Sequence, residues 1–304
     1  HNSHADVIVS RLLQTYTLDG KGDVPAVELA SLYTDQLPEK DISRALMAEH
    51  HVPIYTTVDQ ALTLGTGRLA VDGVLLIAEH GDYPRSKTGQ TIYPKRRLFD
   101  EIVRVFETSG RVVPLYCDKH LADNWPDAKH IYDTCRRMKI PLMAGSSLPV
   151  LWRYPPADVP RGAEVRELVA VSYHRLDAYG FHAVEMAQCL VERRKGGETG
   201  IRAVQCLEND AVWEAGEKGV YDRRLLDAAL GCLRNPRLRG RTLQQAVKNP
   251  VLFHLDYADG LKVNILTLNG AVGEWAAAWR LADNQTAAAL FFTQEARPFM
   301  HFSY

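Results

Sequence analysis

The sequence lacks the paired-cysteine patterns of a disulfide framework or a zinc finger. None of its five cysteines forms a Cys-x-x-Cys pair, and they lie at Cys117, Cys135, Cys189, Cys206 and Cys232. An odd number of scattered thiols is typical of a reduced protein rather than of a small disulfide-rich secreted domain. We therefore interpret the cysteines as small, mostly buried apolar residues.

Long apolar runs are also missing. No run approaches the roughly 20 residues that a helix needs to cross a bilayer, and the segment after His1 lacks the apolar core of a signal peptide. These absences predict a cytoplasmic protein with no membrane partner. An export signal removed upstream of His1 is the alternative that the sequence leaves open.

An excess of charge of one sign is absent as well. The chain carries 36 Lys and Arg against 37 Asp and Glu, which gives a net charge of -1. We therefore expect no nucleic-acid partner and favour a small polar substrate. The basic stretch 234–241 lacks interleaved aromatic residues, so we interpret it as a solvated loop.

What is present is enough apolar sequence for a full core. The 304 residues are 46% hydrophobic, which suits one large or two ordinary domains. In the first half, helical and strand-like patterns alternate. We expect helices at 5–13, 41–50, 98–106 and 125–138, and strands at 26–33, 53–55, 73–78, 112–116 and 141–144. Such alternation predicts a doubly wound parallel sheet of the Rossmann type over residues 1–150.

The pattern changes at the proline-marked junction 151–156. Beyond it, we expect strands at 165–172, 201–207, 251–257, 261–268, 274–281 and 286–292, and helices at 180–194 and 222–232. Short turns between several of these strands favour antiparallel pairing. The predicted fold class is therefore α/β, with the Rossmann-type sheet followed by an α+β domain with a large open antiparallel sheet over residues 151–304.

A dinucleotide-binding domain usually opens with a strand and a G-x-G-x-x-G turn, whose backbone amides approach the pyrophosphate. Here the first recognisable element is already a helix. From the residues alone, nucleotide binding is therefore supported by the expected topology and not by a phosphate-binding motif.

One motif carries a resemblance to a known family. The segment 110–122 reads Gly-Arg-Val-Val-Pro-Leu-Tyr-Cys-Asp-Lys-His-Leu-Ala and is followed by a helix and an apolar strand. It resembles the Gly-Lys-x-Val-x-x-Glu-Lys-Pro-Leu-Ala motif of Gfo/Idh/MocA-like oxidoreductases, with Asp118, Lys119 and His120 in place of Glu-Lys-Pro. The resemblance implies that Lys119 lies near the nicotinamide and a sugar hydroxyl, Asp118 near the cofactor and His120 near the substrate. An ammonium beside a cationic ring would give up its proton more readily. Without this motif, a solvated surface lysine would be the simpler interpretation.

A second motif supports the same resemblance. Family members carry Asp-x-Gly-x-His-x-x-Asp, and this chain has Gly180, His182 and Glu185 in register, with Ala178 at the first acidic position. The resemblance implies that His182 is the catalytic acid or base. Because His182 and Glu185 lie about one helical turn apart, the Glu185 carboxylate, assigned to the substrate site, could also orient the imidazole. A purely structural helix histidine is the alternative.

Weaker parallels complete the site that the resemblance implies. Asp35 follows the second expected element near the place where an acidic residue binds the adenosine ribose, and Glu79 and His80 follow a buried strand beside the expected nicotinamide site. The implied cofactor is NAD or NADP, and the implied substrate is a sugar, a sugar derivative or a cyclitol. We assign no residue as a metal ligand.

Two other functions stay open. A redox-neutral lyase, epimerase or hydrolase could use a metal held by a set of five side chains, namely His80, Asp82, His120, His182 and Glu185. A non-catalytic ligand-binding homologue could keep the fold without the chemistry.

Oligomerisation is expected from the second domain. Trp275 and Trp279 lie four residues apart and so share one face of a strand. An apolar sheet face that its own chain leaves open needs a partner. We therefore predict a homo-oligomer formed through the open antiparallel sheet.

Overall fold

The computed structural model describes residues 4–14, 24–78 and 80–293. The chain divides into two compact units, and the division falls between Gly145 and Ser146. The boundary expected from the sequence lay between residues 150 and 151. No helix in the described ranges has the length and apolar character needed to cross a membrane.

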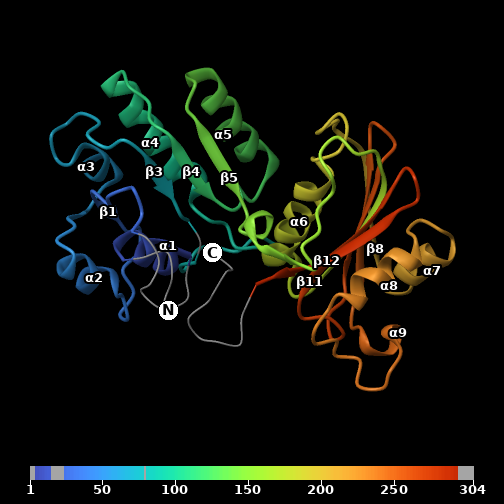
Figure 1. The fold of residues 1–304 in the computed structure, drawn as a ribbon. Helices are drawn as coiled ribbons and strands as arrows, with labels where there is room; N and C mark the ends of the chain where they lie inside the picture. Colours follow the sequence, from blue (N-terminus) through green and yellow to red (C-terminus); the bar gives the residue numbers. More distant parts are fainter. Residues whose placement is uncertain (1–3, 15–23, 79, 294–304) are drawn as a thin grey trace. The chain divides into compact units, whose positions relative to one another are not determined.

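The first unit alternates helices with parallel strands (Figure 1). Its helices are α1 (His4–Leu13), α2 (Ser43–Glu49), α3 (Val58–Thr63), α4 (Lys95–Ser109) and α5 (Trp125–Met138). Its strands are β1 (Leu32–Tyr33), β2 (Ile54–Tyr55), β3 (Val74–Leu76), β4 (Leu115–Asp118) and β5 (Leu142–Gly145). Every pair of neighbouring strands is parallel, which confirms the Rossmann-type prediction.

The parallel strands form two sheets rather than one. β1 pairs with β2, while β3, β4 and β5 form a separate sheet in that order. In the doubly wound order, the first strand lies between the second and the fourth. The β1–β2 pair therefore corresponds to the strands on one side of that first position, and β3, β4 and β5 correspond to the strands on its other side. Within the described residues, the two groups form separate sheets.

The prediction of a strand at 26–33 is wrong for most of that range. Only Leu32 and Tyr33 pair, with Ile54 and Tyr55 as their partners. The apolar run before them stays outside the core, since Val27 is 62% exposed. The physical reason is the length of the partner strand, because β2 contributes only two residues to the ladder.

The core of the first unit lies between α4 and the three-stranded sheet. The buried residues of α4 recur at three- and four-residue spacing and include Leu98, Ile102, Val105 and Phe106, as the sequence predicts. They pack with buried side chains of β3 and β4, among them Leu76 and Leu115. This packing fixes the start of α4 near the carboxyl end of β4, where Lys119 lies.

The second unit is built on a seven-stranded sheet in the order β6-β12-β11-β7-β10-β9-β8. Its strands are β6 (Trp152–Tyr154), β7 (Val165–Ser172), β8 (Ile201–Glu208), β9 (Val251–Tyr257), β10 (Lys262–Thr267), β11 (Trp275–Leu281) and β12 (Thr286–Phe292). Its helices are α6 (Phe181–Val191), α7 (Asp210–Glu217), α8 (Arg223–Gly231) and α9 (Leu243–Ala246). The sheet is mixed rather than wholly antiparallel, because β10 runs parallel to β7. The predicted α+β class is confirmed with that refinement.

Both faces of the central strands are covered within the unit, which corrects the expectation of an open apolar face. Leu168 and Ala170 of β7 pack in the core that contains α6, and Val169 and Val171 pack in the core that contains α8. Trp275 and Trp279 are 2% and 1% exposed in the α6-side core, so they are not a surface for a second subunit. The tryptophans face inward because α6 occupies the side of the sheet onto which they project.

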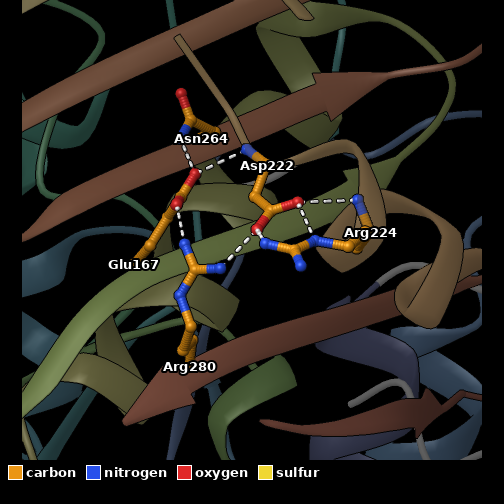
Figure 2. Close-up of polar contacts among 5 residues, drawn as sticks. All are labelled: Glu167, Asp222, Arg224, Asn264 and Arg280. Atoms are coloured by element: carbon orange, nitrogen blue, oxygen red, sulfur yellow. Dashed lines mark hydrogen bonds and ion pairs between the residues drawn. The ribbon is translucent and has the colours of Figure 1, made fainter. Parts of the chain in front are cut away.

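Figure 2 shows how α8 is fixed to the sheet. Asp222 caps α8 by accepting the backbone N–H of Arg224 at 2.8 Å, and its own N–H donates to Glu167 of β7 at 2.8 Å. Arg280 of β11 donates to Glu167 at 2.7 Å and also contacts Asp222. Asn264 of β10 donates to Glu167 at 3.3 Å. The network joins three strands to the helix N-terminus and satisfies the mostly buried Glu167 carboxylate.

Candidate functional site

Lys119 lies directly after the last residue of β4, at the carboxyl edge of the parallel sheet. Ligands of open α/β sheets bind along this edge. Its exposed fraction is only 8%, and that of Asp118 is 4%. The sequence left a solvated surface lysine as the simpler alternative, and this burial rules it out. His120, which follows, is partly buried.

A second buried lysine fixes the backbone at this point. Lys95 is 1% exposed, and its ammonium donates to the backbone carbonyl oxygens of Asp118 and Lys119, each at 2.7 Å. Lys95 is the first residue of α4, where the helix dipole disfavours positive charge. Hydrogen bonding to two carbonyl oxygens compensates for the unfavourable interaction of the ammonium with the helix dipole. It also holds the backbone at Lys119 in place.

Asp118 pairs with the first helix. Its Oδ2 lies 2.5 Å from Nδ1 of His4 in α1. Burial alone would raise the pKa of Asp118, but the hydrogen bond to His4 and the positive charges of His4, Lys119 and Lys95 outweigh burial and lower it. Asp118 is therefore an ionised carboxylate set among basic side chains.

The segment after β3 contributes His80, which is exposed and has a φ of 66°. Its ring lies edge-on to the His4 ring, with centroids 5.9 Å apart. The structure thus brings His80 beside the His4–Asp118 pair. Glu79, the other cofactor-binding residue expected here, lies outside the described residues.

Asp35 lies just past β1 and is already held by three donors. Its Oδ1 accepts from the hydroxyl of Tyr33 at 2.8 Å and from Arg97 at 2.6 Å, and its Oδ2 accepts from the hydroxyl of Tyr83 at 2.9 Å. Burial opposes ionisation, but these hydrogen bonds and the Arg97 charge lower the pKa of Asp35 overall. A carboxylate offers about four acceptor positions, and the described residues fill three of those of Asp35.

In the second unit, His182 lies in the first turn of α6, and its Nδ1 forms a hydrogen bond with the hydroxyl of Ser146. The Ser146 hydroxyl oxygen also accepts the backbone N–H of Leu148 at 3.1 Å. Aromatic rings lie beside the imidazole: the centroids of Tyr179 and Trp275 are each 6.1 Å from the centroid of His182, and that of Phe181 is 6.2 Å away. The imidazole is therefore oriented on one side by a hydroxyl and flanked by aromatic rings.

Glu185 contacts the same serine that contacts His182. Glu185 accepts the backbone N–H of Ser146 at 3.0 Å, while the hydroxyl of that same serine contacts His182. Ser146 therefore contacts both residues, Glu185 through its backbone and His182 through its hydroxyl. Burial raises the pKa of Glu185, although the hydrogen bond from Ser146 partly offsets the increase.

The metal-dependent alternative finds no support in either unit. Across the described ranges, no three His, Cys, Asp or Glu side chains gather as metal ligands would. His80, Asp82 and His120 belong to the first unit, and His182 and Glu185 to the second.

Sequence reasoning missed four residues that build these sites. Lys95, Tyr83 and Arg97 hold the first unit's groups, and Ser146 holds His182. One signal was available, because α4 begins with three consecutive basic residues and has no acidic residue in its first turn. Basic side chains at a helix N-terminus are unfavourable unless something else binds them.

Comparison with known proteins supports the fold. No family model matches the sequence, and no curated protein does. The chain is similar to GenD2 from gentamicin A biosynthesis, solved in complex with NAD, with a TM-score of 0.55 at 14% identity over 97% of this chain and 70% of that one. It is also similar to myo-inositol 2-dehydrogenase from Lactobacillus plantarum, with a TM-score of 0.50 at 10% identity over 94% of this chain and 73% of that one. At these identities, the likeness establishes the two-part fold.

Proposed function

We propose that the chain is a nicotinamide-dependent oxidoreductase of the Gfo/Idh/MocA kind, acting on a sugar, a sugar derivative or a cyclitol. The observation that carries the proposal is the buried Lys119 at the carboxyl edge of a parallel sheet, in a fold shared with GenD2 and with myo-inositol 2-dehydrogenase. The carboxyl edge of such a sheet is where ligands bind.

The described residues fit a dinucleotide. Asp35 would accept a ribose hydroxyl, and its carboxylate would repel a ribose 2′-phosphate unless Arg97 turned toward that phosphate. Asp118 and His80 would lie near the nicotinamide end, and the same fit accommodates NAD or NADP. When bound, the oxidised nicotinamide accepts a hydride from the carbon that bears the substrate hydroxyl.

The chain's own residues would handle the hydroxyl proton. A His182 tautomer with hydrogen on Nδ1 would donate to Ser146, and the lone pair on Nε2 would then be the proton acceptor. Lys119 would hold the substrate oxygen by hydrogen bonding and favour the charge that develops on it. His120 and Glu185 would border the substrate, with Glu185 also accepting the Ser146 backbone N–H.

Calorimetric titration with NAD and with NADP tests the cofactor, and a panel of sugars and cyclitols monitored by reduced-nicotinamide absorbance tests the reaction. Lys119→Met should lower kcat about 100-fold or more, as expected for loss of a group that assists proton transfer. Lys129→Met on the exposed face of α5 is the matched control and should keep the wild-type rate. Absence of binding to either dinucleotide would refute the proposal.

A further inference from the structure

A pocket of about 270 Å³ opens at one end of the seven-stranded sheet. It lies where β7 and β12 end and β11 begins, and it belongs wholly to the second unit. Two arginines of the basic stretch 234–241, Arg234 and Arg237, line it together with Tyr173, Gly273 and Glu274. Both arginines are exposed, as the interpretation of this stretch as a solvated loop expects, and they also line the pocket.

Arg234 is held in place from two sides. Its Nε donates to Glu274 at 3.2 Å, and its guanidinium lies 4.2 Å from the centroid of the Phe292 ring. Glu274 also accepts the backbone N–H groups of Arg234 and Asn235, at 3.0 and 2.9 Å. The glutamate is therefore part of the pocket wall, and its charge offsets that of one arginine.

Arg237 supplies a positive charge that pairs with no carboxylate among residues 4–14, 24–78 and 80–293. Its backbone N–H donates to the carbonyl of Ala271 at 2.8 Å, and its guanidinium lies flat against Gly273. A Cβ at Gly273 would be 2.6 Å from the nearest guanidinium nitrogen, so only glycine leaves this place open. Within the described residues, the Arg237 guanidinium makes no hydrogen bond or ion pair. The charged side chains that line the pocket thus leave one net positive charge facing it.

The pocket shares a wall with the surroundings of His182. Tyr173 lines the pocket, and its ring centroid lies 5.3 Å from that of Trp275, which in turn lies 6.1 Å from that of His182. A ligand that fills the pocket is therefore separated from the imidazole by the rings of Tyr173 and Trp275. Burial raises the pKa of Tyr173, so its hydroxyl stays protonated at neutral pH and can donate a hydrogen bond.

We propose that this pocket binds an anionic group, a carboxylate or a phosphate, carried by the substrate, with Arg237 as its main contact and Arg234 and Tyr173 beside it. Guanidinium groups bind both anions through paired N–H donors. The inference rests on the proposed function and deepens it, because it narrows the substrate to an acidic or phosphorylated carbohydrate.

The test follows the arginine Nε–H signals of the full chain by NMR during titration with inorganic phosphate, D-glucuronate, D-glucose 1-phosphate and, as the neutral reference, D-glucose. We expect the Arg237 and Arg234 signals to shift with the anions and not with glucose. Glucuronate and glucose 1-phosphate separate a carboxylate preference from a phosphate preference. Arg237→Gln should weaken binding of the preferred anion about tenfold or more, as loss of a charged hydrogen bond does.

Two further variants separate the effect of the position of the Arg237 guanidinium from the effect of the overall charge of the stretch. Gly273→Ala should weaken binding by a similar factor without changing the charge, because the new Cβ displaces the Arg237 guanidinium. Arg239→Gln changes the charge of the same stretch outside the pocket lining and should leave binding unchanged. Anion binding that is lost equally in Arg237→Gln and Arg239→Gln, or that leaves the Arg237 signal in place, would overturn the inference.

The two proposals fail separately. Titration with NAD and NADP reports on the first unit, and the arginine signals report on the second. If the chain binds a dinucleotide but the Arg237 Nε–H signal does not shift with any anion, the proposed function stands and only the anion-binding proposal is refuted.

Discussion

Ser146 is placed to control the protonation and direction of His182. Its hydroxyl contacts Nδ1 of the imidazole, while its backbone N–H is held by Glu185 at 3.0 Å. A hydroxyl that fixes one ring nitrogen determines which nitrogen is available for proton transfer. Ser146 is therefore a positioning residue for the proposed acid or base.

Replacing this hydroxyl tests that role. We expect Ser146→Ala to lower kcat about tenfold and to shift the pH profile of kcat/KM, because the imidazole loses its fixed tautomer. Ser146→Thr keeps a hydroxyl and should restore most of the rate and the original profile. Ser147→Ala is the neighbouring control. An unchanged pH profile in Ser146→Ala would show that the serine does not act through His182.

Asp118 gives the first unit a dependence on pH with a defined sign. Its pKa is lowered in the folded chain, whereas an unfolded aspartate titrates near about 3.9. The unfolded chain therefore takes up this proton at higher pH than the folded chain does. The stabilisation is complete above about pH 4 and is lost as the pH falls through the folded value.

Urea unfolding of Asp118→Asn at several pH values measures this contribution. The free energy of unfolding should be lower in the variant than in the wild type at pH 7, and the difference should shrink as the pH falls below about 4. Asp72→Asn is the control, because the side chain of Asp72 is 95% exposed although it pairs with Arg111. A difference that stays constant with pH would contradict the assignment of Asp118 as an ionised, stabilised carboxylate.

At the scale of elements, α8 depends on its N-terminal residue. Asp222 accepts the Arg224 N–H and contacts Arg280, so one side chain both caps the helix and ties it to β11 (Figure 2). Hydrogen bonding from Arg224 and Arg280 lowers the pKa of Asp222 to about 2. The carboxylate thus stays ionised throughout the neutral range.

We expect Asp222→Ala to lower the free energy of unfolding by about 1–3 kcal/mol, since the helix loses its cap and Arg280 loses a partner. Chemical denaturation with an unchanged m-value would measure it. Asp210→Ala, in the exposed first turn of α7, removes an acidic residue that does not cap its helix and should cost less than about 0.5 kcal/mol. Equal losses in the two variants would mean that Asp222 acts only through general helix electrostatics.

Long helices and strands with a strong hydrophobic pattern could be predicted from the sequence. A strand whose length is limited by a short neighbouring strand could not. The bounds of β7, β9, β12 and α5 match the predicted ranges. Most apolar residues of β7 and β9 are buried, and α5 begins after the capping residue Asn124. The run at 26–33 has a strand-like pattern too, but its length is limited by β2. The helices α7 and α9 were not predicted, and they are only eight and four residues long.

The candidate site divides in the same way. Lys119 and His182 were identified because each belongs to a short, contiguous sequence motif. Their partners come from distant segments, since Lys95 reaches the Lys119 carbonyl across 24 positions and Ser146 reaches His182 across 36. Such contacts depend on packing and leave no spacing signal in the sequence.

At the scale of the whole molecule, strand β8 is the exposed margin of the second unit's sheet. Nearly every residue of β8 is exposed, including Val204 at 62% and Ile201 at 40%, although it pairs along its length with β9. An edge strand with exposed apolar side chains can pair with another chain. The predicted homo-oligomer, which the covered central face does not support, would therefore form through β8.

Light scattering tests this prediction. The wild-type chain should have the mass of a dimer or larger assembly, and Val204→Glu should shift it toward the monomer, because a charge on the strand disfavours edge pairing. Val27→Glu is the matched control, since Val27 is also 62% exposed and lies in the first unit. A monomeric mass for the wild type at working concentration would contradict the prediction.

Ser146 is also the residue at which the second unit begins, directly after Gly145. Gly145 ends the last parallel strand, and the next residue holds the imidazole by its side chain and Glu185 by its backbone. One peptide bond thus separates the sheet proposed to carry the cofactor from the hydrogen bond that sets the proton acceptor. Because Ser146 directly follows the last strand of the first unit, a change in the backbone at the end of β5 would reach the imidazole through a single residue.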